Sequence, residues 1–256
     1  MNWQKIFGQI CYAAQRSGLI SVELPKYSNI NNRVTSKPHW LFINCRSQGT
    51  TVGMAGLQQQ NFQYFLVLDF EATCDTTPIH PQEIIEFPIL KVNSNTMEIE
   101  STFHTYVQPV HHPHLTPFCT QLTGIIQSMV DGQPTLQQAL QKVNNWMADE
   151  GLLNPNVSSA FVTCGDWDLK TMLPGQCQHL GLCVPDYFKQ WINLKKAYSK
   201  ATGTWPKSGL PAMVQGLGLK HLGRLHSGID DCRNIANIMR EMTCRGFVFK
   251  LTSQKE

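Results

Sequence analysis

The sequence predicts an α/β domain built around a mixed β-sheet. Three strand-like segments come first, a helical segment and a further strand follow, and helical patterns fill the remainder. That succession is typical of helices packed on a sheet with both parallel and antiparallel strands. With 256 residues, 42% of them hydrophobic, the chain is long enough to bury one core of this kind.

The first predicted strand is the continuous apolar run Phe65–Leu68, which suits a strand buried on both faces. Two more strands are predicted at Glu83–Val92 and Ser101–Val107, where β-branched and aromatic residues are frequent. The sequence Asn93-Ser94-Asn95 between them favours a turn, so the three strands can form a meander. The short apolar run Ala160–Cys164 predicts another buried strand, which leads into a helix beginning at Asp166.

Three segments carry apolar residues at helical spacing. The clearest begins near Thr135, where Thr135 and Gln138 form a capping-box pair ahead of a regular apolar stripe. A short helix is predicted at Leu210–Leu217. A last helix contains the apolar positions of Ile229–Met242 and ends before Gly246.

Composition divides the chain into residues 1–61 and residues 62–256. Residues 1–61 are rich in Asn, Gln, Ser and Gly and hold six basic residues and one acidic residue, so we predict a largely flexible N-terminal extension. Residues 62–256 are predicted to form the folded domain. The sequence has no run of about 18 apolar residues, so it predicts no membrane-spanning helix.

Nine cysteines at irregular spacing, with no Cys-x-x-Cys pair, are predicted to be reduced. Reduced thiols favour the cytoplasm or the nucleus. The alternative is an organelle-targeting presequence, because residues 1–16 are basic and amphipathic. Three histidines, at positions 111, 112 and 114, lie in the Pro-rich segment 108–117, for which an exposed loop is the favoured interpretation over a ligand set.

Residues 187–229 contain seven basic residues and no acidic residue. The basic residues are Lys189, Lys195, Lys196, Lys200, Lys207, Lys220 and Arg224. A stretch of one charge sign can attract the phosphates of a nucleic acid. An ordinary solvated face is the alternative, and composition leaves both readings open.

Four carboxylates occupy positions where a charged side chain is costly. Asp69 and Glu71 end the first strand and share one face of it, Asp168 follows the later buried strand, and Asp231 lies in the first turn of the last helix. Taken singly, an acid near a helix start is more simply a partner of the helix dipole. As a set, such groups repel unless protons or cations neutralise them. Oxygen ligands favour Mg²⁺ or Mn²⁺, and two such ions about 3.5–4 Å apart can hold the attacking and leaving oxygens of a phosphodiester.

Three motifs follow one another along the chain: Asp69-Phe70-Glu71-Ala72-Thr73-Cys74, then Trp167-Asp168, then His226 followed by four residues and Asp231. In this order they resemble the motifs of the DEDDh 3′–5′ exonucleases, in the form found in Eri-type exoribonucleases. The resemblance covers about residues 62–254. It implies an RNase H-like fold, with a mixed five-stranded sheet flanked by helices.

The resemblance implies a role for each matched residue. Asp69 would bridge two metal ions, Glu71 and Asp231 would complete the shell of the first ion, and Asp168 would serve the second. His226 would be the general base that takes a proton from the attacking water. The usual pKa of an imidazole, about 6.5, suits that task near neutral pH.

Two of these positions have an acidic neighbour. Asp166 and Asp168 both follow the same strand, and the Trp-Asp pair of the family selects Asp168. Asp230 and Asp231 are adjacent, and the spacing from the histidine selects Asp231. We predict that the unselected acids cap helices or offset their dipoles.

The same resemblance implies contacts with the terminal nucleotide. Phe118 and Trp167 would stack on its base or sugar, and the segment with Leu122 and Thr123 would line the base pocket. The main chain from Phe70 to Ala72 would face the terminal ribose, whose hydroxyls distinguish RNA from DNA. The predicted substrate contacts are therefore Phe70, Ala72, Phe118, Leu122, Thr123, Trp167 and His226.

Together these features predict a 3′–5′ exoribonuclease that uses two Mg²⁺ (or Mn²⁺) ions, acts on single-stranded 3′ ends of RNA and releases 5′-monophosphates. One rival is a DNA exonuclease of the same fold, which would use the same metals and base. Another is a nucleic-acid-binding or scaffold protein on that fold, without catalysis. Relatives that process histone mRNA carry a nucleic-acid-binding module ahead of the exonuclease. Residues 1–61 do not resemble one, so that specificity is not carried over.

Overall fold

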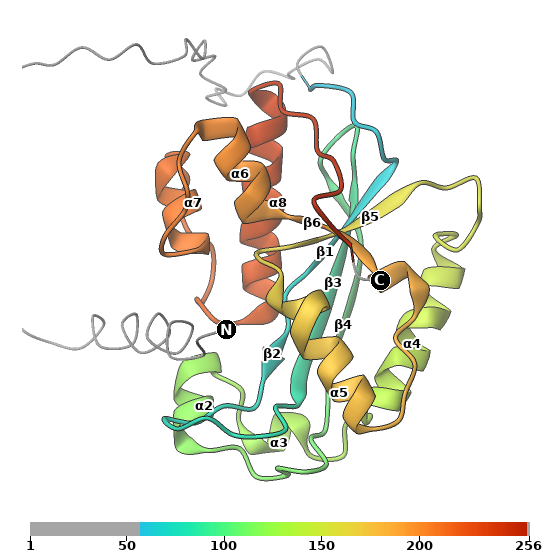
Figure 1. Cartoon of the computed structure of the whole chain (residues 1–256), viewed down its shortest axis with the longest axis vertical. Coiled ribbons are helices and arrows are strands. Elements are labelled where there is room, and N and C mark those ends of the chain that lie inside the picture. Colours follow the sequence, from blue (N-terminus) through green and yellow to red (C-terminus); the bar gives the residue numbers. More distant parts are fainter. Residues whose placement is uncertain (1–56, 255–256) are drawn as a thin grey trace, which may run out of the picture. The chain divides into compact units, whose positions relative to one another are not determined.

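The computed structural model describes residues 57–254, which form a mixed sheet with helices on both faces (Figure 1). This arrangement confirms the predicted α/β class and the RNase H-like fold. Most of the predicted N-terminal extension, including the presequence hypothesis for residues 1–16, lies outside the described residues. Gln60 belongs to the domain, because its side chain donates to the carbonyl of Phe247 over 3.0 Å and accepts from the N–H of Phe249 over 2.9 Å.

The sheet of the described domain has the strand order β2-β3-β1-β5-β6-β7, with β4 beside β3. The strands are β1 (Tyr64–Leu68), β2 (Glu71–Ala72), β3 (Ile84–Asn93), β4 (Ile99–Tyr106), β5 (Ser159–Thr163), β6 (Gln190–Asn193) and β7 (Ser253–Gln254). β1 is antiparallel to β3 and parallel to β5, and β1, β3 and β4 form the predicted meander. There are seven strands rather than the predicted five, because β2 and β7 are two-residue segments too short to leave a sequence pattern.

Helices cover both faces of the sheet. They are α2 (Pro117–Thr123), α3 (Gln127–Val130), α4 (Leu136–Asp149), α5 (Leu173–His179), α6 (Leu194–Thr202), α7 (Leu210–Gly216) and α8 (Gly228–Cys244). α4, α7 and α8 match the predicted helices, and the N–H of Thr135 donates to Oε1 of Gln138 over 2.9 Å as the capping pair requires. The π-helical turn Asp168–Met172 and α5 match the helix predicted near Asp166. The helices α2, α3 and α6 are short and have no counterpart among the predicted helices. Among the described residues, no helix has the length and apolar character needed to span a membrane.

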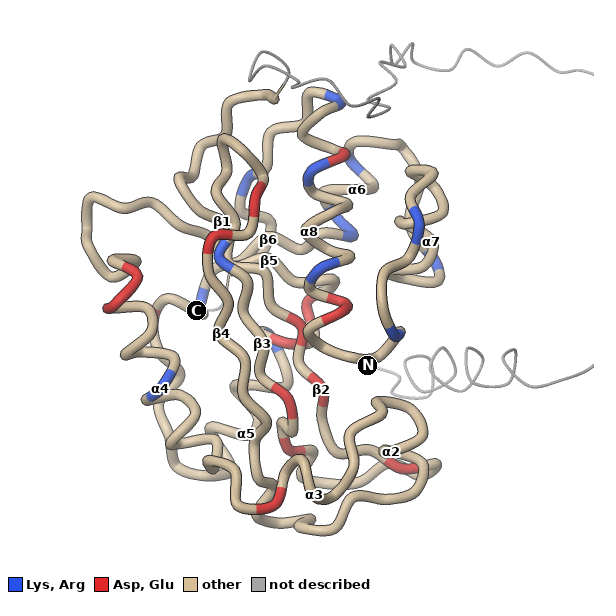
Figure 2. Tube along the Cα trace, turned by 180° about the vertical axis from the view of Figure 1, so that it is seen from behind, with Lys and Arg blue, Asp and Glu red and all other residues tan. Residues whose placement is uncertain are grey.

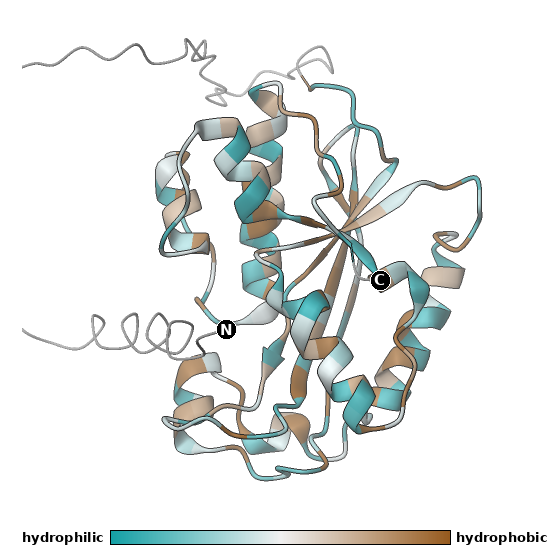
Figure 3. Ribbon diagram, viewed as in Figure 1, coloured by the Kyte–Doolittle hydropathy of each residue, from teal (hydrophilic) through white to brown (hydrophobic). Residues whose placement is uncertain are grey.

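Alternating side chains of β1 enter two separate cores. Phe65 and Val67 pack with residues of α6, α7 and α8, whereas Leu66 and Leu68 pack with residues of α4 and α5. Figure 3 shows the consequence, with hydrophobic strands in the middle and hydrophilic helix surfaces outside. The strand is therefore buried on both faces, as its unbroken apolar run predicts.

The Pro/His segment forms a loop whose main chain is held by a buried carboxylate. Glu83 accepts the N–H groups of Val110, His111 and His112 at distances of 2.7, 2.9 and 2.7 Å. His111 and His114 are exposed, so the predicted exposed loop is confirmed for these two side chains. The loop leads directly into α2, which forms one side of the candidate site described next.

Candidate active site

The ends of β1 and β5 bring the first two motifs together. The two strands are parallel neighbours, so they end at the same edge of the sheet. Asp69 follows β1 directly, and Asp168 begins a π-helical turn, Asp168–Met172, shortly after β5. The N–H of Phe70 donates to Oδ1 of Asp168 over 3.0 Å. This hydrogen bond fixes the second motif against the first.

The N-terminus of α8 brings the third motif to the same place. α8 packs against β1 and β3, and Figure 2 shows acidic residues of β2, β3 and the start of α8 gathered there. The N–H of His226 donates to Oδ2 of Asp231 over 3.0 Å. A side-chain ligand atom from each of Glu71, His226 and Asp231 lies within 4.8 Å of the others. Segments distant in the sequence therefore form one cluster.

Glu86 is a further buried carboxylate, which the sequence analysis did not single out. It lies on β3, where its Oε2 accepts the N–H of Gly228 over 2.9 Å and its Oε1 accepts the N–H of Ile229 over 3.3 Å. Nε2 of His104 is 2.8 Å from the same Oε1. These contacts hold the start of α8 against the sheet. An acid inside a strand buried on both faces is the signal that could have revealed it.

The four predicted ligand acids share a site that disfavours negative charge. Burial, followed by repulsion from neighbouring carboxylates, raises the pKa of Asp69 and of Glu71 well above the usual range. Burial also raises the pKa of Asp168 to about 6 and that of Asp231 to about 7. Hydrogen bonds from backbone N–H groups oppose these last two shifts without cancelling them. Positive charge placed among the acids would relieve the repulsion.

His226 has the opposite shift, as expected for a base. Burial lowers the pKa of its imidazole, and the nearby charge of Arg224 lowers it further. The residue also has a positive φ of 61°, which its hydrogen bond to Asp231 helps to maintain. A neutral imidazole fixed in this way can accept a proton near pH 7.

The donor set fits a hard divalent cation. Within residues 57–254, Oδ1 of Asp231 is one of the buried side-chain atoms that lack a hydrogen-bond partner. The nearest basic group to it is Nε2 of His221, at 3.8 Å. Buried oxygens normally have a partner, and a bound cation would provide one here. Asp231 would share such a cation with Glu71, whereas Asp69 and Asp168 add oxygens from the sheet edge.

The two unselected acids have partners of their own. Asp166 accepts from Nε1 of Trp191 over 3.0 Å and pairs with Lys196 at 2.9 Å, so it joins β6 and α6 rather than capping a helix. Asp230, in the first turn of α8, pairs with Arg233 at 2.8 Å. Both acids are thus satisfied by neighbours within the protein, whereas Oδ1 of Asp231 is not.

The predicted substrate contacts other than His226 are either buried or half-buried. The buried ones are Phe70, Ala72 and Thr123, and the half-buried ones are Phe118, Leu122 and Trp167. Only the half-buried group has side-chain surface to offer a ligand. The Phe70 ring packs edge-on against Phe87 in the core, with ring centroids 4.6 Å apart, so any contact from Phe70 comes from its main chain.

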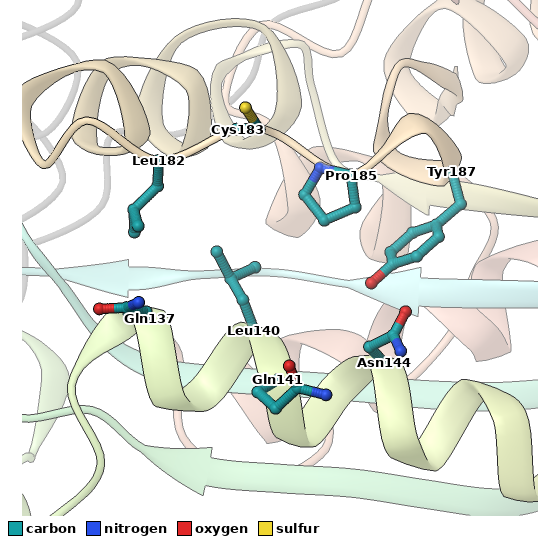
Figure 4. A pocket seen from close by; sticks show the side chains of 8 residues that line it. All are labelled: Gln137, Leu140, Gln141, Asn144, Leu182, Cys183, Pro185 and Tyr187. Atoms are coloured by element: carbon teal, nitrogen blue, oxygen red, sulfur yellow. The ribbon is translucent and has the colours of Figure 1, made fainter.

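An open cavity of about 390 Å³ lies between α4 and residues 182–187 (Figure 4). Its lining residues are Gln137, Leu140, Gln141, Asn144, Leu182, Cys183, Pro185 and Tyr187. The set includes none of the predicted catalytic or substrate-binding residues. The cavity is therefore separate from the candidate active site.

An RNase H-like sheet with acids and a histidine at one edge defines a class of metal-dependent nucleases. The profile of the exonuclease family matches residues 66–239, and the chain belongs to this family, in its Eri-type DEDDh branch. It is 73% identical over 201 residues to human "ERI1 exoribonuclease 3", an alignment that covers 78% of this chain and 60% of that protein. The chain thus spans 60% of the length of this curated relative.

More distant relatives agree with the assignment. The Drosophila melanogaster "3'-5' exonuclease Snipper" is 36% identical over 211 residues, which cover 77% of this chain and 75% of that protein. Among solved structures, the nuclease domain of 3'hExo, a DEDDh family member bound to rAMP, superposes with a TM-score of 0.72 at 37% identity. That match covers 76% of this chain and 98% of the solved domain.

Proposed function

We propose that this protein is a divalent-metal-dependent 3′–5′ exoribonuclease that hydrolyses the terminal phosphodiester bond of RNA and releases 5′-monophosphates. The proposal is carried by the approach of Glu71, His226 and Asp231 to within 4.8 Å, at the edge of the sheet that also presents Asp69 and Asp168. The names of the relatives, "ERI1 exoribonuclease 3" and "3'-5' exoribonuclease 1", support RNA as the substrate.

His226 is the general base of the proposed reaction. Its lowered pKa keeps the imidazole neutral near pH 7, with a lone pair free to accept a proton from the attacking water. Asp231 fixes the main chain of His226, so the ring needs little reorganisation before the proton moves. The protonated ring then returns its proton to solvent after the product leaves.

Two Mg²⁺ (or Mn²⁺) ions are proposed to bind at the four acids Asp69, Glu71, Asp168 and Asp231. When bound, such ions stabilise the negative charge that develops on the phosphate oxygens. The raised pKa values of the acids supply the reason for binding, because the repulsion that raises them is replaced by attraction to the cations. Family membership supports divalent-metal dependence, and the pair of ions is part of the proposal.

Single-stranded RNA fits the surface around the acids. The half-buried aromatic rings of Phe118 and Trp167 can stack on bases regardless of sequence. The basic stretch 187–229 contributes three exposed lysines with no ion pair to any described residue: Lys200, Lys207 and Lys220. They are available to the phosphates of the upstream strand, whose binding should weaken with salt.

The test compares the parent with Asp69→Asn and His226→Ala on a labelled single-stranded RNA in Mg²⁺ or Mn²⁺. We expect the loss of His226 to lower the rate by about 10²- to 10⁴-fold, and the change at Asp69 to lower it by at least as much. Asp186→Asn is the matched control, since this acid has a side chain that is 93% exposed, and it should retain the parental rate. Full activity in either site variant would refute the site.

DNA is the second candidate substrate, because the same acids and base can cleave it. Matched RNA and DNA oligonucleotides separate the two, and equal or faster digestion of DNA would defeat the assignment to RNA. A parent that binds RNA but cleaves neither polymer with any metal tested would instead indicate a binding protein on an exonuclease fold.

A further inference from the structure

The loop between α7 and α8 carries His226 and approaches α2 (Figures 1 and 2). One part of the loop is fastened to α8. The N–H of Leu222 donates to Oδ1 of Asn234 over 2.9 Å, and Nδ2 of Asn234 donates back to the carbonyl of Leu222 over 2.8 Å. The next residues of the loop are held to α8 by their main chain, because the N–H groups of Arg224 and His226 donate to Asp230 and Asp231. Their connection to α2 comes from the side chain of Arg224.

Arg224 joins the loop to α2. Its Nη2 donates to the carbonyl of Gln121 over 2.5 Å and to that of Leu122 over 3.3 Å. These carbonyls lie in the last turn of α2, where carbonyl groups have no partner within the helix and a cation is favourable. Gly124, which ends α2, leaves room for this contact, because a Cβ there would lie 2.9 Å from Nε of Arg224.

The main chain of Arg224 is fixed to α8 at the same time. Its N–H donates to Oδ2 of Asp230 over 3.0 Å. The preceding residue, Gly223, lies so close to Asp230 that a Cβ there would be 2.3 Å from the carboxylate. Arg224 therefore connects α2 with α8 two residues before His226.

We propose that Arg224 is a positioning residue that holds the loop carrying His226 against α2, the helix that presents Phe118 and Leu122 to the nucleotide. This inference rests on the proposed exonuclease function. A nucleotide packed on α2 would stabilise the carbonyl groups that accept from Arg224. Through Arg224 it would also stabilise the orientation of His226, the general base. Arg224 acts through the loop and needs no contact with a phosphate.

The test measures kcat, KM and the salt dependence of RNA cleavage for Arg224→Ala and Arg224→Lys. We expect kcat to fall roughly 10- to 100-fold in both variants, because small displacements of a catalytic group are costly, whereas KM should change much less. The Arg224→Lys variant should not recover kcat, because one ammonium group cannot reproduce the planar set of donors of a guanidinium. The slope of log KM against log salt should stay parental, because no phosphate contact is lost.

Arg233→Ala is the matched control. Arg233 is also exposed and pairs with the same Asp230, but no hydrogen bond or ion pair joins it to α2 among the described residues. It should keep the parental kcat. Rescue of kcat by Arg224→Lys, or a salt slope smaller by about one charge in Arg224→Ala, would identify a phosphate contact and overturn the proposal. A parental kcat in Arg224→Ala would overturn it as well.

Amide hydrogen exchange provides a readout that does not need activity. Exchange of the loop residues 222–227 should become faster in Arg224→Ala and stay parental in Arg233→Ala, and equal exchange in all three proteins would overturn the proposal. An inactive parent whose loop is nevertheless loosened by Arg224→Ala would refute the exonuclease function while supporting the link between α2 and the loop. If the parent is active but loop exchange is unchanged in Arg224→Ala, the exonuclease function would stand and the link between α2 and the loop would be refuted.

Discussion

The two sides of the candidate site are held by different kinds of contact. On one side, Asp69 and Asp168 lie beyond the ends of neighbouring parallel strands, and the main-chain N–H of Phe70 donates to Asp168, so the sheet and this backbone donor hold them together. On the other side, the start of α8 and its preceding loop depend on a few polar contacts, chiefly from Glu86 and Arg224. The acids of the sheet edge are therefore robust to single substitutions nearby. The base is positioned by side chains that can be removed one at a time.

Removal of the Glu86 carboxylate should have the largest effect on the side of the site that is formed by α8. Glu86→Ala leaves the N–H groups of Gly228 and Ile229 without their acceptor. An unsatisfied buried donor costs about 1–3 kcal/mol, so we expect the free energy of unfolding to fall by about 2–5 kcal/mol, together with a loss of cleavage. Urea denaturation measures the first effect. Glu86→Gln, which keeps an acceptor oxygen, should lose less, and equal urea midpoints for Glu86→Ala and the parent would contradict this role.

A smaller effect is expected where the two sides touch. A Cβ at position 228 would lie 2.6 Å from the carbonyl oxygen of Asp69, so Gly228→Ala must push α8 away from the end of β1. Overpacking of this kind costs about 1–3 kcal/mol and should lower the thermal midpoint. Gly175→Ala, in α5, is the control, because a Cβ there meets nothing within 4 Å. If both variants melt alike, the contact between the two sides is looser than described.

The smallest effect concerns the pH dependence of the metal-free protein. The folded-state pKa is about 6 for Asp168 and about 7 for Asp231, above the ordinary value of 3.8. The folded state therefore holds protons that the unfolded state releases, and the stability they contribute is lost as pH rises from about 4 to about 7. The lowered pKa of His226 opposes this fall near pH 6, but one histidine is outweighed by the two acids. The thermal midpoint in a chelator should fall over this range by a few degrees.

Metal should reverse that trend. Mg²⁺ binds the folded, deprotonated site, so it should raise the midpoint at pH 7 more than at pH 5. Asp166, whose hydrogen bonds lower its pKa to about 2, acts only in more acidic solution and does not disturb this window. In Asp231→Asn, the thermal midpoint in a chelator should decrease less between pH 5 and 7 than in the parent. A midpoint that rises from pH 5 to 7 in the chelator would contradict the repulsion among these acids.

Much of the fold could be predicted because it depends on local pattern. The unbroken apolar run of β1 predicted a strand buried on both faces, and the regular stripes of α4 and α8 predicted helices. The helix predicted near Asp166 is present as the π-helical turn Asp168–Met172 and α5, whereas β6 and the short helices α2, α3 and α6 have no counterpart in the prediction. Short segments bury too few residues to show a period, and tertiary packing decides their conformation.

The motifs alone name the four ligand acids and the histidine, because their chemistry lies in residue types and spacing. How those groups are held depends on contacts between segments that are far apart in the sequence. Glu86 looks like a misplaced acid in an apolar strand until α8 brings its N–H groups to it, and Arg224 looks like one basic residue among seven until α2 presents its carbonyls. The physical reason is that a polar side chain takes its role from the partner it meets, and these partners come from distant parts of the chain.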